Sequence, residues 1–150
     1  MAFRISTKGR YGLRALIDLA AQNGDRPILL ADIARRQGVS KRYLERLFTQ
    51  LRSGGVIRSV RGAAGGYLLA RNAAEIRIVD VLELLEGPIR PADCTGRRGD
   101  DCRRREKCVT YELWRDLGEA IRAKLAGVTL EDLRRRQTVL DEAAVQSFEI

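Results

Sequence analysis

The N-terminal part of the chain combines apolar positions of helical period with residues that end helices. Four apolar residues recur at i, i+3, i+4 and i+7 and predict an amphipathic helix over residues 8–23. Residues 28–38 predict a short helix that Gly38 can end in a left-handed conformation. Ser40, a favourable N-cap, opens a longer amphipathic helix that runs to Arg52. This order predicts a helix-turn-helix.

Two short runs rich in apolar and β-forming residues follow, at positions 56–60 and 67–70, and predict two strands. The segment between them, Arg61-Gly62-Ala63-Ala64-Gly65-Gly66, supplies the positive φ angles that a tight hairpin needs. It lacks the Lys-Ser/Thr ending of a phosphate-binding P-loop. A hairpin directly after a helix-turn-helix is a wing, so the expected fold is mostly α with a small β-hairpin wing.

The C-terminal half predicts further helices. Residues 78–86 carry an apolar stripe that ends at Gly87-Pro88. Farther on, apolar residues repeat every four positions beside Trp114 and predict a long dimerisation helix, unless it packs back on its own domain; they are Leu113, Leu117, Ile121 and Leu125. The expected division is a winged helix-turn-helix domain (1–87), a cysteine loop (88–108), dimerisation and C-terminal helices, the last one short (109–137), and a tail (138–150).

Charge is distributed unevenly along the chain. The 150 residues carry a net charge of +8. Residues 1–71 hold 14 Lys and Arg against 4 Asp and Glu, a net charge of +10, whereas the remaining 79 residues hold 14 against 16. A localised positive field is the electrostatic footprint of a nucleic-acid-binding module, although a basic solvated surface gives the same sum.

Two absences bear on the class of protein. The chain has no His, which excludes Ser-His-Asp hydrolysis, Cys-His proteolysis and His-ligated zinc chemistry and disfavours an enzyme. No apolar run approaches the roughly 20 residues that span a bilayer, and the N-terminus lacks the apolar run of a signal peptide. We therefore expect a cytoplasmic protein with no membrane partner.

The second helix of the helix-turn-helix carries polar side chains of the kind that read DNA. Arg42 can bind guanine, Glu45 can accept from cytosine, and Tyr43 can contact phosphate. Arg61, at the base of the wing, can enter a minor groove. The competing interpretation of such a helix is a merely solvated face.

All three cysteines lie in one segment, Cys94, Cys102 and Cys108, separated by seven and five residues. An odd number in a cytoplasmic chain does not suit a disulfide framework. Thiolates on a basic loop suit a soft metal or an iron-sulfur cluster, and the surrounding cations would lower their pKa values. Those cations are Arg90, Arg97, Arg98, Arg103, Arg104, Arg105 and Lys107. Unused thiols, a thiol redox switch and zinc are the alternatives.

The chain resembles a known family over nearly all of residues 4–140. The segments that carry the resemblance are Ser6-Thr7-Lys8-Gly9-Arg10-Tyr11, Leu30-Ala31-Asp32-Ile33, Gln37-Gly38-Val39-Ser40, Tyr43-Leu44-Glu45, Val60-Arg61-Gly62, Gly65-Gly66-Tyr67-Leu68-Leu69 and the run from Cys108 to Leu117. They are similar to the winged-helix regulators that include IscR, NsrR, RirA and CymR, and most similar to the IscR-like iron-sulfur cluster regulators.

The resemblance implies a homodimeric transcription factor whose three cysteines, here Cys94, Cys102 and Cys108, hold a [2Fe-2S] cluster. In the IscR-like members a histidine three residues after the last cysteine is the fourth ligand, and here that position is Tyr111. The nominal fourth ligand is therefore the Tyr111 phenolate. The alternatives are an external thiol or water, a [4Fe-4S] cluster with a labile iron, or a carboxylate, namely Asp93, Asp100, Asp101, Glu106 or Glu112.

The resemblance also implies DNA contacts on the second helix and the wing, at Ser40, Tyr43, Glu45 and Arg61. Arg42, from the helix face, and Gly65, in the wing tip, complete the expected DNA-binding set. We expect a regulator, not an enzyme, whose operator binding follows iron-sulfur cluster supply and whose partners are duplex DNA, a second copy and cluster-assembly or carrier proteins. The alternatives are a repressor responsive to nitric oxide, iron or redox state, and a thiol redox or metal-carrier protein.

Overall fold

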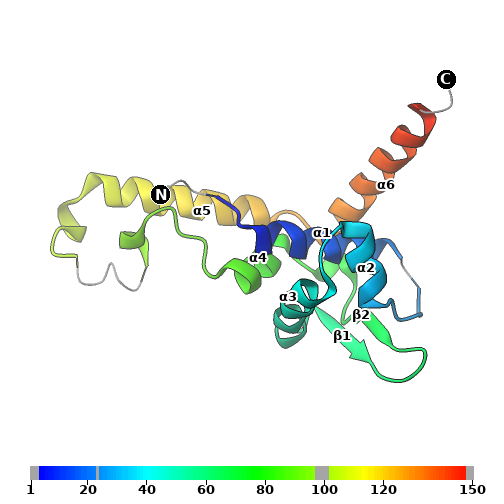
Figure 1. Ribbon diagram of the computed structural model, residues 1–150. Coiled ribbons are helices and arrows are strands. Elements are labelled where there is room, and N and C mark those ends of the chain that lie inside the picture. Colours follow the sequence, from blue (N-terminus) through cyan, green and yellow to red (C-terminus); the bar gives the residue numbers. More distant parts are fainter. Residues whose placement is uncertain (1–3, 23, 97–101, 148–150) are drawn as a thin grey trace.

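A winged domain and two long C-terminal helices that extend away from it in different directions make up the molecule (Figure 1). The computed structural model describes residues 4–22, 24–96 and 102–147. Its α-helices are α1 (Thr7–Ala21), α2 (Leu30–Gln37), α3 (Lys41–Ser53), α4 (Ile78–Glu86), α5 (Val109–Ala126) and α6 (Leu130–Ser147). The strands are β1 (Ile57–Val60) and β2 (Gly66–Leu69), and short 3-10 turns are η1 (Ala73–Glu75), η2 (Asp93–Thr95) and η4 (Arg105–Lys107).

Local sequence signals place the helix-turn-helix, which confirms the prediction. Gly38 ends α2 at φ 65°, a left-handed angle that glycine adopts without strain. Ser40 then caps α3, where its hydroxyl accepts a hydrogen bond from the Tyr43 backbone N–H at 3.2 Å. Ser6 caps α1 in the same way.

The two strands pair antiparallel and form the expected wing. Ile57 lies opposite Leu69, and Val60 lies opposite Gly66 at the tip. The segment before α2 adds a further bridge, since Ile28 and Tyr67 exchange two backbone hydrogen bonds at 2.9 and 2.8 Å. A Cβ at Gly66 would overlap the Ile28 backbone, so glycine permits this close approach.

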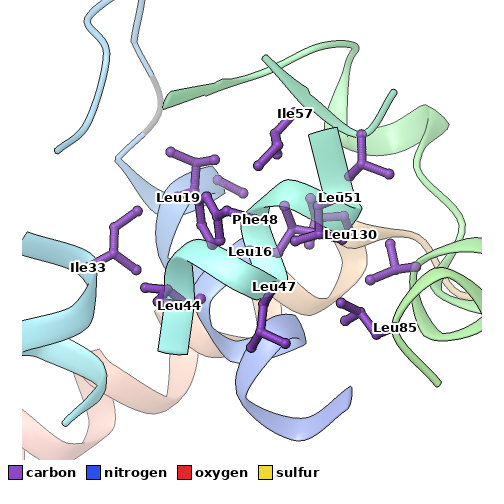
Figure 2. Close-up of a cluster of buried hydrophobic side chains, with 14 of the residues drawn as sticks. Leu16, Leu19, Ile33, Leu44, Leu47, Phe48, Leu51, Ile57, Leu85 and Leu130 are labelled. Atoms are coloured by element: carbon purple, nitrogen blue, oxygen red, sulfur yellow. The ribbon is translucent and has the colours of Figure 1, made fainter. Parts of the chain in front are cut away.

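One apolar core joins every helix of the winged domain (Figure 2). Phe48 of α3 lies at its centre, fully buried, with Leu16 of α1 and Leu85 of α4 packed into the same cluster. Leu130, the first residue of α6, is also fully buried there. Burying side chains of this size contributes roughly 1.5–3 kcal/mol each, so α6 is anchored in the winged domain at its start.

The last helix differs from the prediction. A short helix and a tail were expected over 130–137 and 138–150, but α6 continues to Ser147. The tail prediction is wrong for residues 138–147. The reason is that this stretch contains neither Gly nor Pro, and half of its residues are Ala, Leu, Glu or Gln, which favour helix even without a buried stripe. None of the described helices is long and apolar enough to cross a membrane.

Candidate nucleic-acid interface and cysteine loop

The exposed face of α3 presents the polar side chains expected to read DNA. Leu44, Leu47, Phe48 and Leu51 are buried, which turns Arg42 and its neighbours to solvent on the opposite side. β1 packs against α3, so this helix and the wing form one edge of the domain, the lower edge in Figure 1. The geometry fits a helix in the major groove with the wing beside it.

Glu45 is placed on this face with a neutralising partner. Its carboxylate lies 3.5 Å from the Lys41 ammonium, one helical turn earlier, and both side chains are exposed. A carboxylate in this position opposes binding beside DNA phosphates unless a base donates to it. Glu45 thus lies exposed on the face predicted to read DNA.

Tyr43 adopts a different position from the one expected of a phosphate contact. Its ring packs edge-on against Tyr11 of α1, with 6.4 Å between ring centroids. Its hydroxyl is buried and has no hydrogen-bond partner among the described residues. In this conformation the hydroxyl faces the protein, and contact with phosphate would require the side chain to rotate.

The wing tip is built by glycine geometry. Arg61 follows the last residue of β1 and is exposed, as a groove-inserting side chain must be. Gly65 is buried, and a Cβ there would lie 2.5 Å from the Val60 carbonyl oxygen and 2.8 Å from that of Gly62. Its backbone N–H donates to the Gly62 carbonyl at 3.0 Å. Gly65 therefore closes the tip that positions Arg61.

The described parts of the cysteine loop, residues 88–96 and 102–108, lie beside α5 and reach the end of this helix that is far from the wing (Figure 1). Cys94 lies in η2, which packs against α5, and Cys108 is the N-cap residue of the same helix. Cys102 is exposed and precedes η4. None of the three forms a disulfide. Within the described ranges, no three Cys, Asp or Glu side chains converge into a metal site, and residues 97–101, with the candidates Asp100 and Asp101, lie outside the described residues.

Cys108 has a thiolate-stabilising environment. The pKa of its thiol is lowered, first by a hydrogen bond with the Thr110 hydroxyl at 3.2 Å and then by the Tyr111 backbone N–H at the start of α5. Arg104 adds a smaller electrostatic contribution. A thiol of lowered pKa is the form that binds a soft metal or reacts as a nucleophile.

Tyr111 is held next to the loop. Its phenolic oxygen accepts a hydrogen bond from Arg105 Nε at 3.0 Å, and the same guanidinium lies over its ring, 5.1 Å from the centroid. Cys102 and Tyr111 line one open hollow of about 690 Å³ together with Arg103, Arg105, Glu106, Glu112 and Arg115. The nominal fourth ligand thus lines the same hollow as one cysteine and the carboxylates Glu106 and Glu112.

Sequence reasoning missed Glu86 as a structural contact. One oxygen of its carboxylate accepts from the Ser6 backbone N–H and hydroxyl, both at 2.8 Å, and from the Gly9 backbone N–H at 3.1 Å. It fixes the start of α1 to the end of α4. The partners lie 77–80 residues apart, so no local pattern in a single sequence could reveal this contact.

The helix-turn-helix, the wing and the basic N-terminal half together define a winged-helix DNA-binding regulator of transcription. Comparison with known proteins gives the particular family. Residues 5–136 match the model of the Rrf2 family, described as an iron-dependent transcriptional regulator. The chain belongs to this family, whose members are DNA-binding regulators and not enzymes.

Relatives and solved structures agree. The chain is 43% identical over 143 residues to the HTH-type transcriptional regulator IscR of Photorhabdus laumondii, covering 95% of this chain and 86% of that protein. It is 41% identical to IscR of Yersinia pestis over 96% of this chain and 87% of that one. Among structures, CymR, the global cysteine regulator of B. subtilis, superposes with a TM-score of 0.73 at 39% identity, covering 89% and 97% of the two chains. IscR of T. potens superposes with a TM-score of 0.72 at 37% identity, covering 89% of this chain and 88% of that one.

Proposed function

We propose that this regulator binds its operator as a homodimer and that an iron-sulfur cluster held by Cys94, Cys102 and Cys108 controls the binding. The observation that carries the proposal is a loop with three free thiols placed along α5, in a chain similar to IscR. A bound cluster would supply redox-sensitive, labile iron-thiolate chemistry. The chromosome is the partner, which places the protein in the cytoplasm.

The donor set fits a cluster in its chemistry. Three thiols are present, the pKa of Cys108 is already lowered, and the loop carries many cations that offset thiolate charge. A Cys₃His site is impossible because the chain contains no His. We propose a [2Fe-2S] cluster with Tyr111 as the nominal fourth ligand, and a [4Fe-4S] cluster with a labile iron as the alternative.

The DNA contacts of the proposal come from the edge formed by α3 and the wing. Ser40, Arg42, Glu45 and Arg61 are exposed there, and Tyr43 joins them only if it rotates. Gly65 acts through the shape of the tip. Two such edges in a dimer would occupy successive major grooves of a pseudo-palindromic operator.

Dimerisation is proposed from the apolar face of α5. Val109, Leu113 and Leu117 lie one turn apart and are 78%, 56% and 42% exposed, with Trp114 beside them. A contiguous apolar face of this kind on a charged protein marks an interaction surface. Leu125, at the other end of the helix, packs on the core of the winged domain, so the exposed apolar residues of the N-terminal part of α5 are the surface proposed to meet a second copy.

The test is an anaerobic preparation analysed for iron, sulfide and its absorption spectrum, with binding to duplexes selected from a randomised pool measured before and after cluster removal. We expect bound iron and sulfide and a change in operator preference on removal. Protein that contains stoichiometric zinc and takes up no cluster on reconstitution contradicts the cluster proposal. Reversible thiol oxidation that changes binding in such protein would favour the redox-responsive alternative.

The fourth ligand has its own test. Tyr111→Phe removes the phenolic oxygen but keeps the ring under Arg105. We expect faster loss of the cluster in air and a shifted absorption spectrum. Unchanged cluster lifetime and spectrum exclude the phenolate and direct the search to Glu106 and Glu112, the carboxylates of the same hollow.

A further inference from the structure

The last turn of α4 contacts three other helices through consecutive side chains. Glu83 reaches α5, Leu84 covers the end of α3, and Glu86 caps the start of α1. Between them, Leu85 points into the core. One helical turn of α4 therefore connects α5, α3 and α1.

The contact with α5 is a two-pronged ion pair. Arg122 donates from Nε to Glu83 Oε1 at 2.7 Å and from Nη2 to Oε2 at 3.0 Å. This paired geometry fixes direction as well as distance. The Arg122 hydrogen bonds lower the pKa of Glu83, in agreement with a carboxylate that stays charged.

Backbone hydrogen bonds form a second contact, between the start of α4 and the segment that follows α5. The Ile78 backbone N–H donates to the Val128 carbonyl at 3.0 Å, and the Leu130 N–H donates to the Ile76 carbonyl at 2.9 Å. Arg77, which lies between Ile76 and Ile78, is six positions before Glu83, about 9 Å along a helix. Two contacts this far apart fix the direction of α5 relative to α4, because either contact alone would allow α5 to rotate about it.

The same turn of α4 fixes α3. Gly54, the C-cap residue of α3, lies so close to Leu84 that a Cβ there would overlap the leucine side chain. The C-terminal end of α3 therefore packs on Leu84, the residue next to Glu83. A shift of α5 at Arg122 has a direct route to α3 through two adjacent side chains.

We propose that Glu83 and Arg122 are positioning residues that set the angle between α5 and α3 and so the half-site spacing that the regulator accepts. The inference rests on the proposed homodimer. α5 has 18 residues and is about 27 Å long. A rotation of about 10° at its joint moves the far end by about 5 Å, more than the rise of about 3.4 Å per base pair.

The experiment uses the full chain and operator duplexes that the wild-type protein selects from a randomised pool. The spacer between half-sites is then lengthened and shortened by one and by two base pairs, and affinity is measured for each duplex. For Arg122→Gln we expect the preference for the selected spacing to fall by about three- to fivefold, the upper part of the range that an exposed ion pair supports. The exchanged pair, Glu83→Arg with Arg122→Glu, should recover part of it.

Lys124→Gln is the matched control, because Lys124 is an exposed cation in the last turn of α5 and forms no ion pair within the described part of the chain. It should keep the wild-type preference. Thermal stability and dimer mass should be unchanged in all variants, which separates positioning from unfolding. The inference is overturned if Arg122→Gln keeps the full spacing preference, if Lys124→Gln loses it equally, or if the exchanged pair recovers nothing. A wild-type protein without any spacing preference would instead contradict the proposed dimeric binding.

Discussion

At the scale of single residues, Tyr43 presents a conflict between stability and recognition. Its hydroxyl is buried without a partner, and an unsatisfied buried hydroxyl costs about 1–3 kcal/mol. Tyr43→Phe should therefore raise the free energy of unfolding by about 1 kcal/mol, measured by urea denaturation. If the hydroxyl stays inside the protein on DNA, operator affinity is unchanged.

Tyr11→Phe is the control for this prediction, because Tyr11 forms the other half of the ring pair and its hydroxyl is not among the buried, unpartnered atoms of the described residues. It should give no gain in stability. A Tyr43→Phe protein that is less stable than wild type contradicts the prediction. A loss of operator affinity with the expected gain in stability would show that Tyr43 rotates outward on DNA.

Residues with local roles were predictable and residues with distant partners were not. Ser40 and Gly38 act within their own turn, so their types at their positions were sufficient. The position of the Tyr43 hydroxyl depends on Tyr11, 32 positions earlier, and the role of Glu83 depends on Arg122, 39 positions later. Neither partner leaves a periodic signal in the sequence.

At the scale of elements, the wing depends on one glycine. A Cβ at Gly65 would overlap the carbonyl oxygens of Val60 and Gly62, which are backbone atoms and cannot move aside cheaply. Gly65→Ala should reshape the tip and displace Arg61, with at least about tenfold weaker operator binding, equal to about 1.4 kcal/mol. Electrophoretic shifts at constant salt measure the affinity.

Ala63→Ser, also in the tip but exposed, is the control and should bind as wild type. The melting temperature of Gly65→Ala should fall only slightly, because the tip contributes little to the core. Wild-type affinity in Gly65→Ala would mean that the tip does not position a DNA contact.

The start of α6 gives a prediction about pH. Arg134 and Arg135 lower the pKa of Glu131 to about 2 through hydrogen bonds to its carboxylate. A lowered pKa in the folded state adds stability above the unfolded value, near 4.3, that is lost as pH falls toward 2. Glu131→Gln should cost less than about 1 kcal/mol at pH 7, since Arg135 is largely exposed.

Urea denaturation at pH 7 and at pH 3 checks this. The difference in unfolding free energy between wild type and Glu131→Gln should shrink at the lower pH. Glu142→Gln, on the exposed later part of α6, should show no such trend. A difference that stays constant between the two pH values would refute the assignment of the shifted pKa to Glu131.

Helical segments with a buried stripe were predicted, and the second half of α6, which has none, was not. α3 and α4 carry apolar residues at helical spacing because they cover the core. α6 touches the core with Leu130 and Leu133, but Val139, Leu140 and Val145 are exposed, so its second half shows no stripe. Helix propensity alone extends it, a weak signal in a single sequence.

At the scale of the whole molecule, the exposed stripe of α5 is the feature that a single chain does not explain. Leu113 and Leu117 lie on the part of α5 beyond the contacts with the winged domain. Leu113→Lys should convert the proposed dimer to monomer, because a desolvated ammonium at an apolar interface without a partner carries a penalty of several kcal/mol. Sedimentation equilibrium measures the mass.

The matched control places the same side chain on another face of the helix. Glu119→Lys introduces lysine where the side chain is exposed and more than a quarter turn around the helix from Leu113 and Leu117, and it should leave the dimer intact. Operator affinity should fall in the monomeric variant and stay unchanged in the dimeric one, since two half-sites one helical turn apart need two copies of α3 held together. Leu113→Lys protein that remains dimeric would show that the dimer interface does not lie on this face of α5. Monomeric protein that binds the full operator as tightly as wild type would separate recognition from dimerisation.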